Sequence, residues 1–308
     1  MVEDYLHSPL ECNKFAMYYP MQFSHLRYFK IKCSQYINRY STNSPYISGD
    51  SIAKLTDYEV YGRHRNRKLS IRRLRNAKSI FVPGDLLTQF LEESKNLPIK
   101  AKVLVVGNSD QNFDFDVKIP DTIALWLCQN NAIPPRPGLA TLPIGLENLK
   151  LGRAGKPKYF ESFHPDAIKD RVLVPPMAPS NKIRMQVIYL AIQNPDIFDV
   201  RKNLMHEEEY FNLTRRYRFI LCCEGNGYEN HRIWETLYQG SFPVLLRTKW
   251  STNLEYLNLP ILFIDSVEDL TKNILSEFAI KNSHFDPKAA KELWVPYWKQ
   301  IIENGVLS

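Results

Sequence analysis

Short apolar segments, each bounded by polar residues, glycine or proline, recur along this chain. They occupy residues 79–82, 102–107, 122–128, 185–192, 218–223, 242–246 and 261–264. Because they are short and apolar without alternation, these segments are typical of strands buried on both faces of a parallel sheet. Helix-like segments lie between them, at residues 85–93, 229–239, 267–278 and 287–304, and Asp286 is placed to cap the last one. Alternating strands and helices predict doubly wound α/β units.

A proline-rich segment at residues 170–182 divides the expected strands into two sets. Its three prolines give it the composition of a connection between domains. A chain of 308 residues is long enough for two α/β domains, each with its own core. We therefore expect an N-terminal domain at residues 1–179 and a C-terminal domain at residues 180–308.

The composition is that of a globular, basic protein. Hydrophobic residues make up 44% of the chain, which is enough to bury a substantial core and argues against a disordered protein. The formal net charge of +7 favours an anionic partner, such as a nucleotide diphosphate, an acidic glycan, a nucleic acid or a membrane surface. Charge alone does not choose among these partners.

The cysteines and the N-terminal residues indicate a cytoplasmic protein. The five cysteines are an odd number without the spacing of a metal site, which is typical of a reducing compartment. Residues 1–19 lack the basic start and apolar core of a signal peptide, and no later stretch approaches the length of about 18 apolar residues that a membrane span needs. We therefore expect no membrane anchor in this chain.

The segment at residues 219–230 carries the strongest functional pattern. An apolar strand at residues 219–223 runs into a Glu-Gly-Asn-Gly loop at residues 224–227, and a helix begins near residues 228–230. In open α/β sheets ligands bind at such a loop, because glycine allows close backbone approach and the helix N-terminus offers N–H groups to phosphate. The pattern therefore predicts a diphosphate site.

Arg232 and Glu235 are three residues apart and therefore share one face of the helix that follows this loop. A guanidinium group can bridge phosphate oxygens, and a carboxylate can accept hydrogen bonds from both ribose hydroxyls. Together the two side chains match a nucleoside diphosphate. By residue type alone, an ordinary surface ion pair between them, beside glycines that only shape a turn, explains the pattern equally well.

Residues 218–244 resemble the donor-site signature of exostosin-like glycosyltransferases. The shared features are the Gly-rich loop, an Arg-x-x-Glu helix and a following Gly-x-x-Pro-Val strand, in the same order and spacing. Weaker similarity to the acceptor-side domain of bacterial and viral homologues covers residues 105–110, 129–131 and 142–148. The resemblance implies a GT-B fold, in which two Rossmann-like domains face a cleft and the C-terminal helix can pack back on the first domain.

The resemblance also implies roles for residues of the C-terminal domain. Arg232 would contact the donor diphosphate, and Glu235 would contact the ribose. Asn226 and Gly227 would line the phosphate loop, and Gly225 and His231 are further candidates beside it, although relatives vary at the position of His231. Arg201, which follows the first expected strand of this domain, would be a second phosphate ligand, or it could flank the next helix from the surface. Glu224 departs from the small or basic residue of many relatives, so the nucleotide and the sugar stay open.

An inverting transferase needs a base in the first domain that takes a proton from the acceptor hydroxyl. Asp110 ranks first, because it follows the apolar run at residues 102–106 and would project from the carboxyl edge of the sheet. Asp50 and Glu147 rank next, since a Gly-containing turn presents each carboxylate, and His231 is a candidate on the donor side. Each acid could instead stabilise its own turn.

Residues 114–116 read Asp-Phe-Asp, the pattern with which metal-dependent GT-A transferases hold a divalent cation. Three residues make a weak motif, and this one lies far from the donor signature, in a polar segment that is typical of a solvated loop. We expect no essential metal, and no cofactor apart from the nucleotide-sugar donor.

The segment at residues 63–78 supports an alternative function. Its eight lysines and arginines, without an acidic residue, are typical of a protein that binds nucleic acid or another anionic surface. Because it lacks the interleaved aromatic residues that stack on bases, we favour contact with a glycan acceptor or a membrane surface over nucleic acid. A solvated cationic face is the third interpretation. The main prediction is transfer of a sugar from a nucleotide-sugar donor to a glycan hydroxyl, with inversion and without metal.

Overall fold

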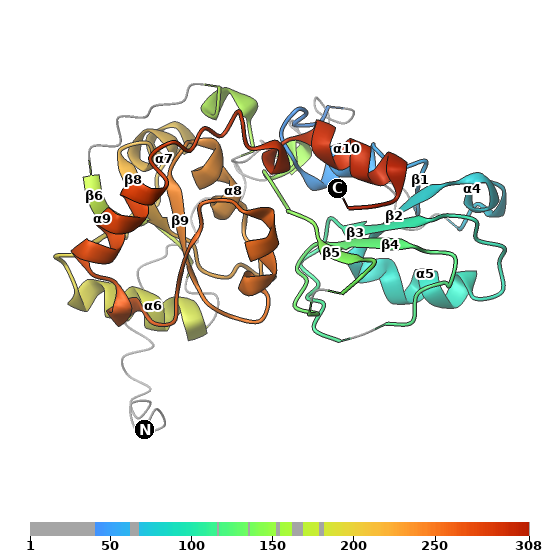
Figure 1. The fold of residues 1–308 in the computed structure, drawn as a ribbon, viewed down its shortest axis with the longest axis horizontal. Helices are drawn as coiled ribbons and strands as arrows, with labels where there is room; N and C mark the ends of the chain where they lie inside the picture. Colours follow the sequence, from blue (N-terminus) through green and yellow to red (C-terminus); the bar gives the residue numbers. More distant parts are fainter. Residues whose placement is uncertain are drawn as a thin grey trace.

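The structure of the protein is a computed structural model that describes residues 41–61, 68–115, 117–134, 136–151, 155–161, 169–178 and 182–307. Its strands form two five-stranded sheets. Figure 1 shows the sheets in two lobes, with helices around each of them. The fold class is therefore α/β, as the alternation of apolar segments predicts.

The first sheet contains its strands in the order of the chain. They are β1 (Tyr58–Glu59), β2 (Ser79–Pro83), β3 (Val103–Gly107), β4 (Leu125–Cys128) and β5 (Leu139–Thr141). The helices from this part of the chain are α3 (Gly49–Ala53), α4 (Ile71–Asn76) and α5 (Leu87–Ser94), with the 3-10 helices η2 (Gly84–Leu86), η3 (Leu149–Leu151) and η4 (Pro157–Tyr159). Because neighbouring strands are parallel, the loops after β3, β4 and β5 share one edge of the sheet.

The second sheet has the strand order β10-β9-β8-β6-β7. Its strands are β6 (Lys169–Val174), β7 (Phe198–Val200), β8 (Tyr217–Leu221), β9 (Phe242–Leu246) and β10 (Leu262–Ile264). The helices around it are α6 (Lys182–Gln193), α7 (Glu207–Thr214), α8 (His231–Tyr238) and α9 (Lys272–Lys281). This part of the chain also contains the 3-10 helices η5 (Ser251–Leu257), η6 (Val267–Asp269) and η7 (Lys291–Leu293).

The order of the second sheet contains a topological switch point. The chain runs from β6 outward to β7 and then returns to the other side of β6 to form β8. The loops that leave the carboxyl ends of β6 and β8 therefore diverge, and open α/β sheets bind ligands in the crevice between such loops. In the first sheet the described strands follow one direction without a reversal. The topology is therefore consistent with the ligand site expected after β8 of the second sheet, which stays a prediction.

Burial on both faces explains why the central strands are continuous apolar runs. In β3, Val103 and Val105 pack in one hydrophobic cluster, whereas Leu104 and Val106 pack in another. The first of these clusters continues into the second sheet, where it includes Ile220 of β8. The two sheets are thus joined through a shared core.

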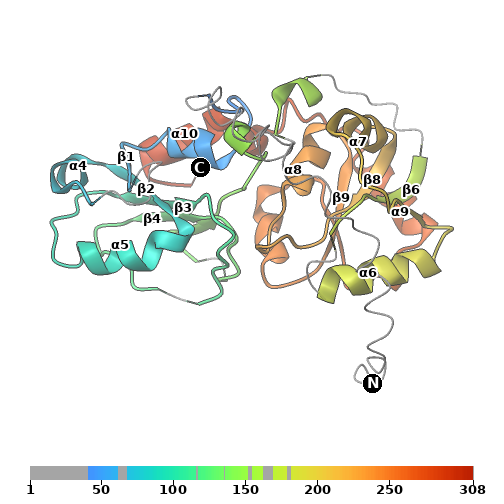
Figure 2. The same cartoon turned by 180° about the vertical axis from the view of Figure 1, so that it is seen from behind.

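The last helix, α10 (Val295–Asn304), returns to the first lobe. The backbone N–H of Val295 donates to the carbonyl of Pro45 at 2.9 Å, and Trp298 and Ile301 are buried in the cluster that contains Val103. Figures 1 and 2 show α10 beside the first sheet, although it follows the second sheet in the chain. This helix begins at Val295 and not at residue 287, so Asp286 is not its cap.

One expected strand is wrong. Residues 185–192 lie within α6. Val187 and Ala191 are buried, whereas Met185 and Tyr189 are exposed, which is the spacing of a helix with one buried face.

Strand β6 extends the second sheet toward the N-terminus. It pairs with β7 and with β8, so the second sheet begins at Lys169, inside the range expected for the first domain. Pro175 and Pro176 follow β6 directly, in the loop at the switch point.

Several expectations concern residues outside the described ranges. These are residues 1–19, Cys12 and Cys33. Within the described ranges, no helix has the length and the apolar character needed to cross a bilayer.

Candidate functional site

The loops at the carboxyl ends of the two sheets contact each other. The backbone N–H of Tyr228 donates to Oδ1 of Asn112 at 2.8 Å, and the N–H of Glu229 donates to Oδ1 of Asn130 at 2.8 Å. Tyr228 and Glu229 precede α8, whereas Asn112 and Asn130 follow β3 and β4. These contacts bring the Gly-rich loop of the second lobe to the expected acceptor side of the first.

Gly227 allows this close approach. A Cβ atom at this position would lie 2.7 Å from Oδ1 of Asn130, which is too close for contact. At Gly225 the nearest atom would be the carbonyl oxygen of Glu229, at 3.1 Å. Gly227 therefore has a packing role between the lobes in addition to its expected place in the phosphate loop.

Arg232 and Glu235 lie in α8, as their pattern predicts, and Tyr210 of α7 links them. Arg232 Nε donates to the Tyr210 hydroxyl at 3.0 Å, and this hydroxyl donates to Glu235 Oε2 at 3.3 Å. Glu235 is only 6% exposed, so the two residues do not form the exposed ion pair considered as an alternative. Burial raises the pKa of Glu235 to about 7, Arg232 opposes that rise and nearby Glu147 adds to it. The carboxyl group of Glu235 thus changes its charge near neutral pH.

A second guanidinium group lies at the switch point with Arg232. Arg184, near the start of α6, donates from Nε to the carbonyl of Glu224 at 2.7 Å and from Nη1 to that of Ala178 at 3.2 Å. Arg232 donates from Nη2 to the carbonyl of Pro176 at 3.3 Å. Burial and the positive charge of Arg232 lower the pKa of Arg184, so the two cations are close enough to repel each other. Two such cations at the carboxyl edge of a sheet suit an anion with several oxygens, such as a diphosphate.

Two residues of this arrangement, Arg184 and Tyr210, are not identified by the sequence pattern. Arg184 precedes the segment that was expected to be a strand. An Arg in the first turn of a helix, directly after a proline-rich loop, is the signal that could have found it. Tyr210 follows three glutamates in α7, and nothing in that pattern indicates a contact with α8.

His231 also joins the two lobes. Its Nδ1 lies 2.7 Å from the carbonyl oxygen of Gly145, which follows β5. A carbonyl only accepts, so Nδ1 carries the proton and Nε2 is the acceptor of the neutral ring.

Arg201 is engaged elsewhere. Its Nη2 lies 2.9 Å from Oδ2 of Asp199 and donates to the hydroxyl of Tyr217 at 3.2 Å. Both of these partners belong to strands, Asp199 to β7 and Tyr217 to β8, and the expected role of Arg201 as a phosphate ligand stays a prediction.

Two of the carboxylates expected as the base have different surroundings. Asp110 is exposed and accepts a hydrogen bond from Asn226 Nδ2 at 3.3 Å, beside the Gly-rich loop. Asp50 is buried in α3, where Lys150 Nζ lies 2.7 Å from its Oδ1 and Asn108 Nδ2 donates to the same oxygen at 3.0 Å. Lys150 and Asn108 both engage Oδ1 of Asp50, whereas Asp110 is exposed, so Asp110 stays the first candidate for the base and its role stays a prediction.

Glu147, the third candidate, is buried in the first lobe. Its negative charge raises the pKa of Glu235, which places it near the helix that carries Arg232. Glu147 of the first lobe therefore lies close enough to Glu235 of the second lobe for their charges to interact.

The Asp-Phe-Asp segment follows β3. Oδ2 of Asp114 accepts a hydrogen bond from the Tyr228 hydroxyl at 3.2 Å, and Asp116 lies outside the described residues. In the parts of the chain that the structure describes, no group of three His, Cys, Asp or Glu side chains is arranged to hold a metal ion.

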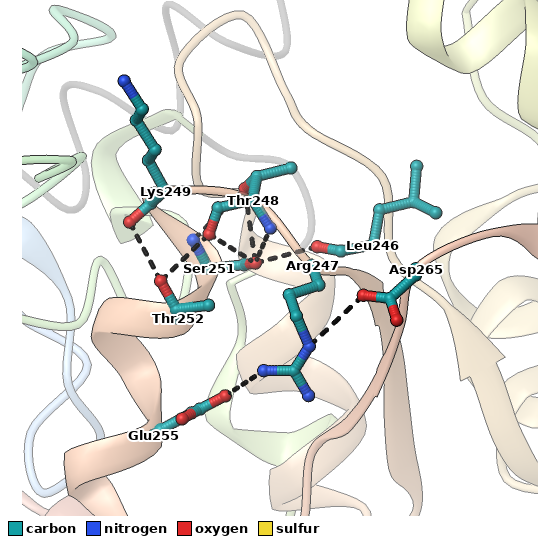
Figure 3. Close-up of polar contacts among 8 residues, drawn as sticks. All are labelled: Leu246, Arg247, Thr248, Lys249, Ser251, Thr252, Glu255 and Asp265. Atoms are coloured by element: carbon teal, nitrogen blue, oxygen red, sulfur yellow. Dashed lines mark hydrogen bonds and ion pairs between the residues drawn. The ribbon is translucent and has the colours of Figure 1, made fainter.

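A small hollow opens beside the switch point, at the carboxyl ends of β8 and β9. The residues that line it are Ile183, Cys222, Cys223, Glu224, Leu246, Thr248 and Trp250. Trp250 Nε1 donates to Oε1 of Glu224 at 2.6 Å. Figure 3 shows how Ser251 holds the turn after β9: its Oγ donates to the carbonyl of Leu246 at 2.8 Å and accepts from the N–H of Thr248 at 2.8 Å. These bonds fix the wall of the hollow.

The basic segment is described from residue 68 onward. The cations of its exposed face are Lys68, Arg72, Arg73, Arg75 and Lys78, and Leu74 of α4 is buried beneath them. Figures 1 and 2 agree in placing α4 at the end of the first lobe that points away from the second sheet. This face is thus separate from the lobe contact, and its anionic partner stays a prediction.

Comparisons with known proteins do not identify a family. No protein-family model matches the chain, and no curated protein matches it. One solved structure with a similar arrangement is the pneumococcal O-GlcNAc transferase GtfA in complex with UDP and GlcNAc, with 12% sequence identity and a TM-score of 0.30. The match covers 77% of this chain and 56% of that one, so this chain spans about half of its length. Similarity at this level carries no argument about function.

Proposed function

We propose that this protein is a glycosyltransferase that binds a nucleotide-sugar donor at the switch point of its second sheet. The observation that carries the proposal is the convergence of Arg184 and Arg232 beside the Gly-rich loop at residues 224–227. Two half-buried cations that repel each other are stabilised by an anion, and a diphosphate offers oxygens to both guanidinium groups. The α/β fold and the resemblance of residues 218–244 to exostosin-like enzymes agree with a GT-B transferase.

In the proposed donor site, the nucleoside end of the donor lies beside Glu235. Glu235 accepts from the ribose hydroxyls, and Tyr210 keeps its carboxylate and the Arg232 guanidinium in a fixed relation. Glu235 is buried, and a hydrogen bond in such low-polarity surroundings is electrostatically stronger than one at an exposed carboxylate. Its elevated pKa implies tighter ribose binding above about pH 7, where the group is ionised.

The proposed reaction is a direct displacement at the anomeric carbon. Asp110 takes the proton of the acceptor hydroxyl, whose oxygen forms the new bond as the bond to the diphosphate breaks, with inversion. Arg184 and Arg232 offset the negative charge that develops on the departing diphosphate, which is the task of a metal ion in other transferases. His231, with Nε2 as acceptor, is the second candidate for the base.

The test is the release of nucleoside diphosphate from a panel of UDP-, GDP-, CDP-, ADP- and dTDP-sugars, with water or simple sugars as acceptors. We expect slow, enzyme-dependent release from donors of one nucleotide class. The Arg232→Ala variant should lose it, whereas Arg218→Ala, an exposed Arg paired with Asp170, should keep it. Release that is absent for every donor, or equal in the two variants, contradicts the proposal.

A further inference from the structure

Five exposed cations of the first lobe take no part in the proposed donor site. We call them the basic face, and they are Lys68, Arg72, Arg73, Arg75 and Lys78. Residues 68–78 include no aspartate or glutamate. An acid at the border is Asp57, whose Oδ2 accepts from the backbone N–H of Lys78 at 2.7 Å. The five positive charges outnumber this acid, so the basic face attracts anions.

Helix α4 holds three of these cations in a fixed arrangement. Arg72 and Arg75 are three residues apart and share one side of the helix, whereas Leu74 is buried in the core of the first lobe. The turn before the helix is also attached to this core, because the N–H of Ser70 donates to the Tyr58 hydroxyl at 2.9 Å. The basic face is therefore part of the folded first lobe.

An apolar side chain lies among these cations. Ile71 is 49% exposed and is four residues before Arg75, so the two side chains are neighbours on α4. An isoleucine gains little from a hydrated phosphate backbone, but it can enter the boundary between lipid headgroups and acyl chains. Residues 68–78 contain no aromatic side chain that could stack on bases. The composition thus fits a lipid surface better than a nucleic acid.

The position of α4 agrees with this partner. Figures 1 and 2 show the helix at the end of the first lobe that points away from the second sheet, where a flat surface can reach it without meeting the second lobe. A glycan acceptor would have to reach Asp110 at the contact between the lobes, which is separate from this end. A lipid surface therefore fits the position better than the acceptor does.

We propose that the basic face binds the protein peripherally to membranes with anionic headgroups, and that Ile71 enters the interface there. This inference goes beyond the proposed function and does not depend on the donor site. Each lysine or arginine close to such a membrane strengthens binding about fivefold, so several cations together give a large effect that salt weakens.

The experiment is cosedimentation of the full chain with lipid vesicles in about 0.1 M NaCl. One set of vesicles is phosphatidylcholine alone, and the other is an equal mixture with phosphatidylglycerol. We expect at least about 100-fold tighter binding to the anionic set. The triple variant Arg72→Glu, Arg73→Glu, Arg75→Glu should lower that affinity at least about 100-fold.

Two further variants test the place and the mode of binding. The matched control changes three exposed lysines in and after α9 (Lys272→Glu, Lys281→Glu, Lys288→Glu), which gives the same net charge and should keep the affinity within about fivefold. Ile71→Ser keeps every cation and should weaken binding to the anionic vesicles about fivefold, because it removes the apolar group that enters the interface.

The outcomes decide between membrane binding and its alternatives. Equal binding to the two sets of vesicles, equal losses in the two triple variants, or unchanged binding of Ile71→Ser overturns the proposal. Tighter binding to a short DNA duplex than to the anionic vesicles, at equal phosphate concentration, also overturns it and identifies nucleic acid as the partner. Release of nucleoside diphosphate from a donor should be unchanged in the arginine variant, so this proposal and the donor site can fail separately.

Discussion

Asp110 and Asn226 are 116 positions apart in the chain, yet Asn226 Nδ2 lies 3.3 Å from Oδ2 of Asp110. Asp110 follows β3 of the first sheet, and Asn226 is in the Gly-rich loop after β8 of the second. The contact places the favoured base beside the loop that is expected to surround the donor phosphates. Binding and proton transfer are thereby assigned to different lobes, so single substitutions should separate them.

The first prediction concerns the base. Asp110→Asn should lower the rate of sugar transfer by about 100-fold or more, the usual scale for loss of general-base catalysis, and should leave nucleoside diphosphate affinity nearly unchanged. Initial rates and calorimetry on one preparation check both parts. A wild-type transfer rate in Asp110→Asn would contradict this assignment. The base would then be whichever of the other three candidates gives an inactive variant with intact donor affinity, tested as Asp50→Asn, Glu147→Gln and His231→Gln.

The second prediction concerns the ribose. Glu235→Gln should weaken the binding of a ribonucleoside diphosphate about tenfold, because an amide accepts less strongly than a carboxylate and presents N–H groups to the hydroxyls. The 2′,3′-dideoxy analogue lacks those hydroxyls, so its weaker affinity should hardly change. Equal losses for the two ligands would remove Glu235 from the ribose site.

The third prediction concerns the contact at Gly227. Gly227→Ala should lower the free energy of unfolding by about 1–3 kcal/mol, because the added Cβ atom would lie 2.7 Å from Oδ1 of Asn130. In the background of Asn130→Ala, which removes that oxygen, the same substitution should cost much less. Urea denaturation of the four proteins of this cycle measures the difference, and strictly additive effects would contradict the packing role.

The fourth prediction concerns pH and Glu229. Its Oε1 accepts from the N–H of Ile144 at 2.8 Å and from Trp234 Nε1 at 2.5 Å. Burial nevertheless raises the pKa of Glu229 to about 8, because these bonds offset only part of the loss of hydration. The folded protein therefore binds a proton between about pH 4.3 and pH 8 that the unfolded chain has released.

The extra proton on Glu229 stabilises the folded protein. This stabilisation is fully present below about pH 4.3 and is lost as the pH rises through about 8, and over this range the free energy of unfolding falls by up to about 1.4 kcal/mol per pH unit. Glu229→Gln keeps an acceptor and cannot titrate, so its unfolding free energy should depend less on pH over this range. Parallel pH profiles for the wild type and the variant would show that Glu229 does not hold the proton.

The sequence pattern predicts the buried strands of both sheets well, because a parallel strand covered on both faces needs a continuous apolar run. β3 and β8 are examples. It fails for α6, where Met185 and Tyr189 are exposed apolar residues that hide the helical period. It also misses β1, β5, β6 and β7. β6 is an interior strand almost entirely within the segment expected to connect the domains, and its first three residues are exposed, so it does not form a continuous apolar run.

The candidate site is predictable only where its residues are close in sequence. The loop and the pair Arg232 and Glu235 lie within one strand-loop-helix unit, which sequence reasoning can evaluate as a whole. Arg184 and Tyr210 come from two other helices, and only the strand order of the second sheet brings them to α8. Residues that come together from separate helices have no characteristic separation in the sequence, so no sequence motif identifies them.

The central claim is a diphosphate site built from Arg184 and Arg232, and calorimetric titration of the wild type and three variants with UDP, GDP, CDP, ADP and dTDP tests it most directly. At least one nucleoside diphosphate should bind, and Arg184→Ala and Arg232→Ala should each weaken it about 10- to 100-fold, the scale of a lost charge-assisted hydrogen bond. Arg201→Ala, which removes a guanidinium already paired with Asp199, should bind as the wild type does. Binding of none of the five diphosphates to the wild type, or unchanged affinity in folded Arg184→Ala and Arg232→Ala, would contradict the account.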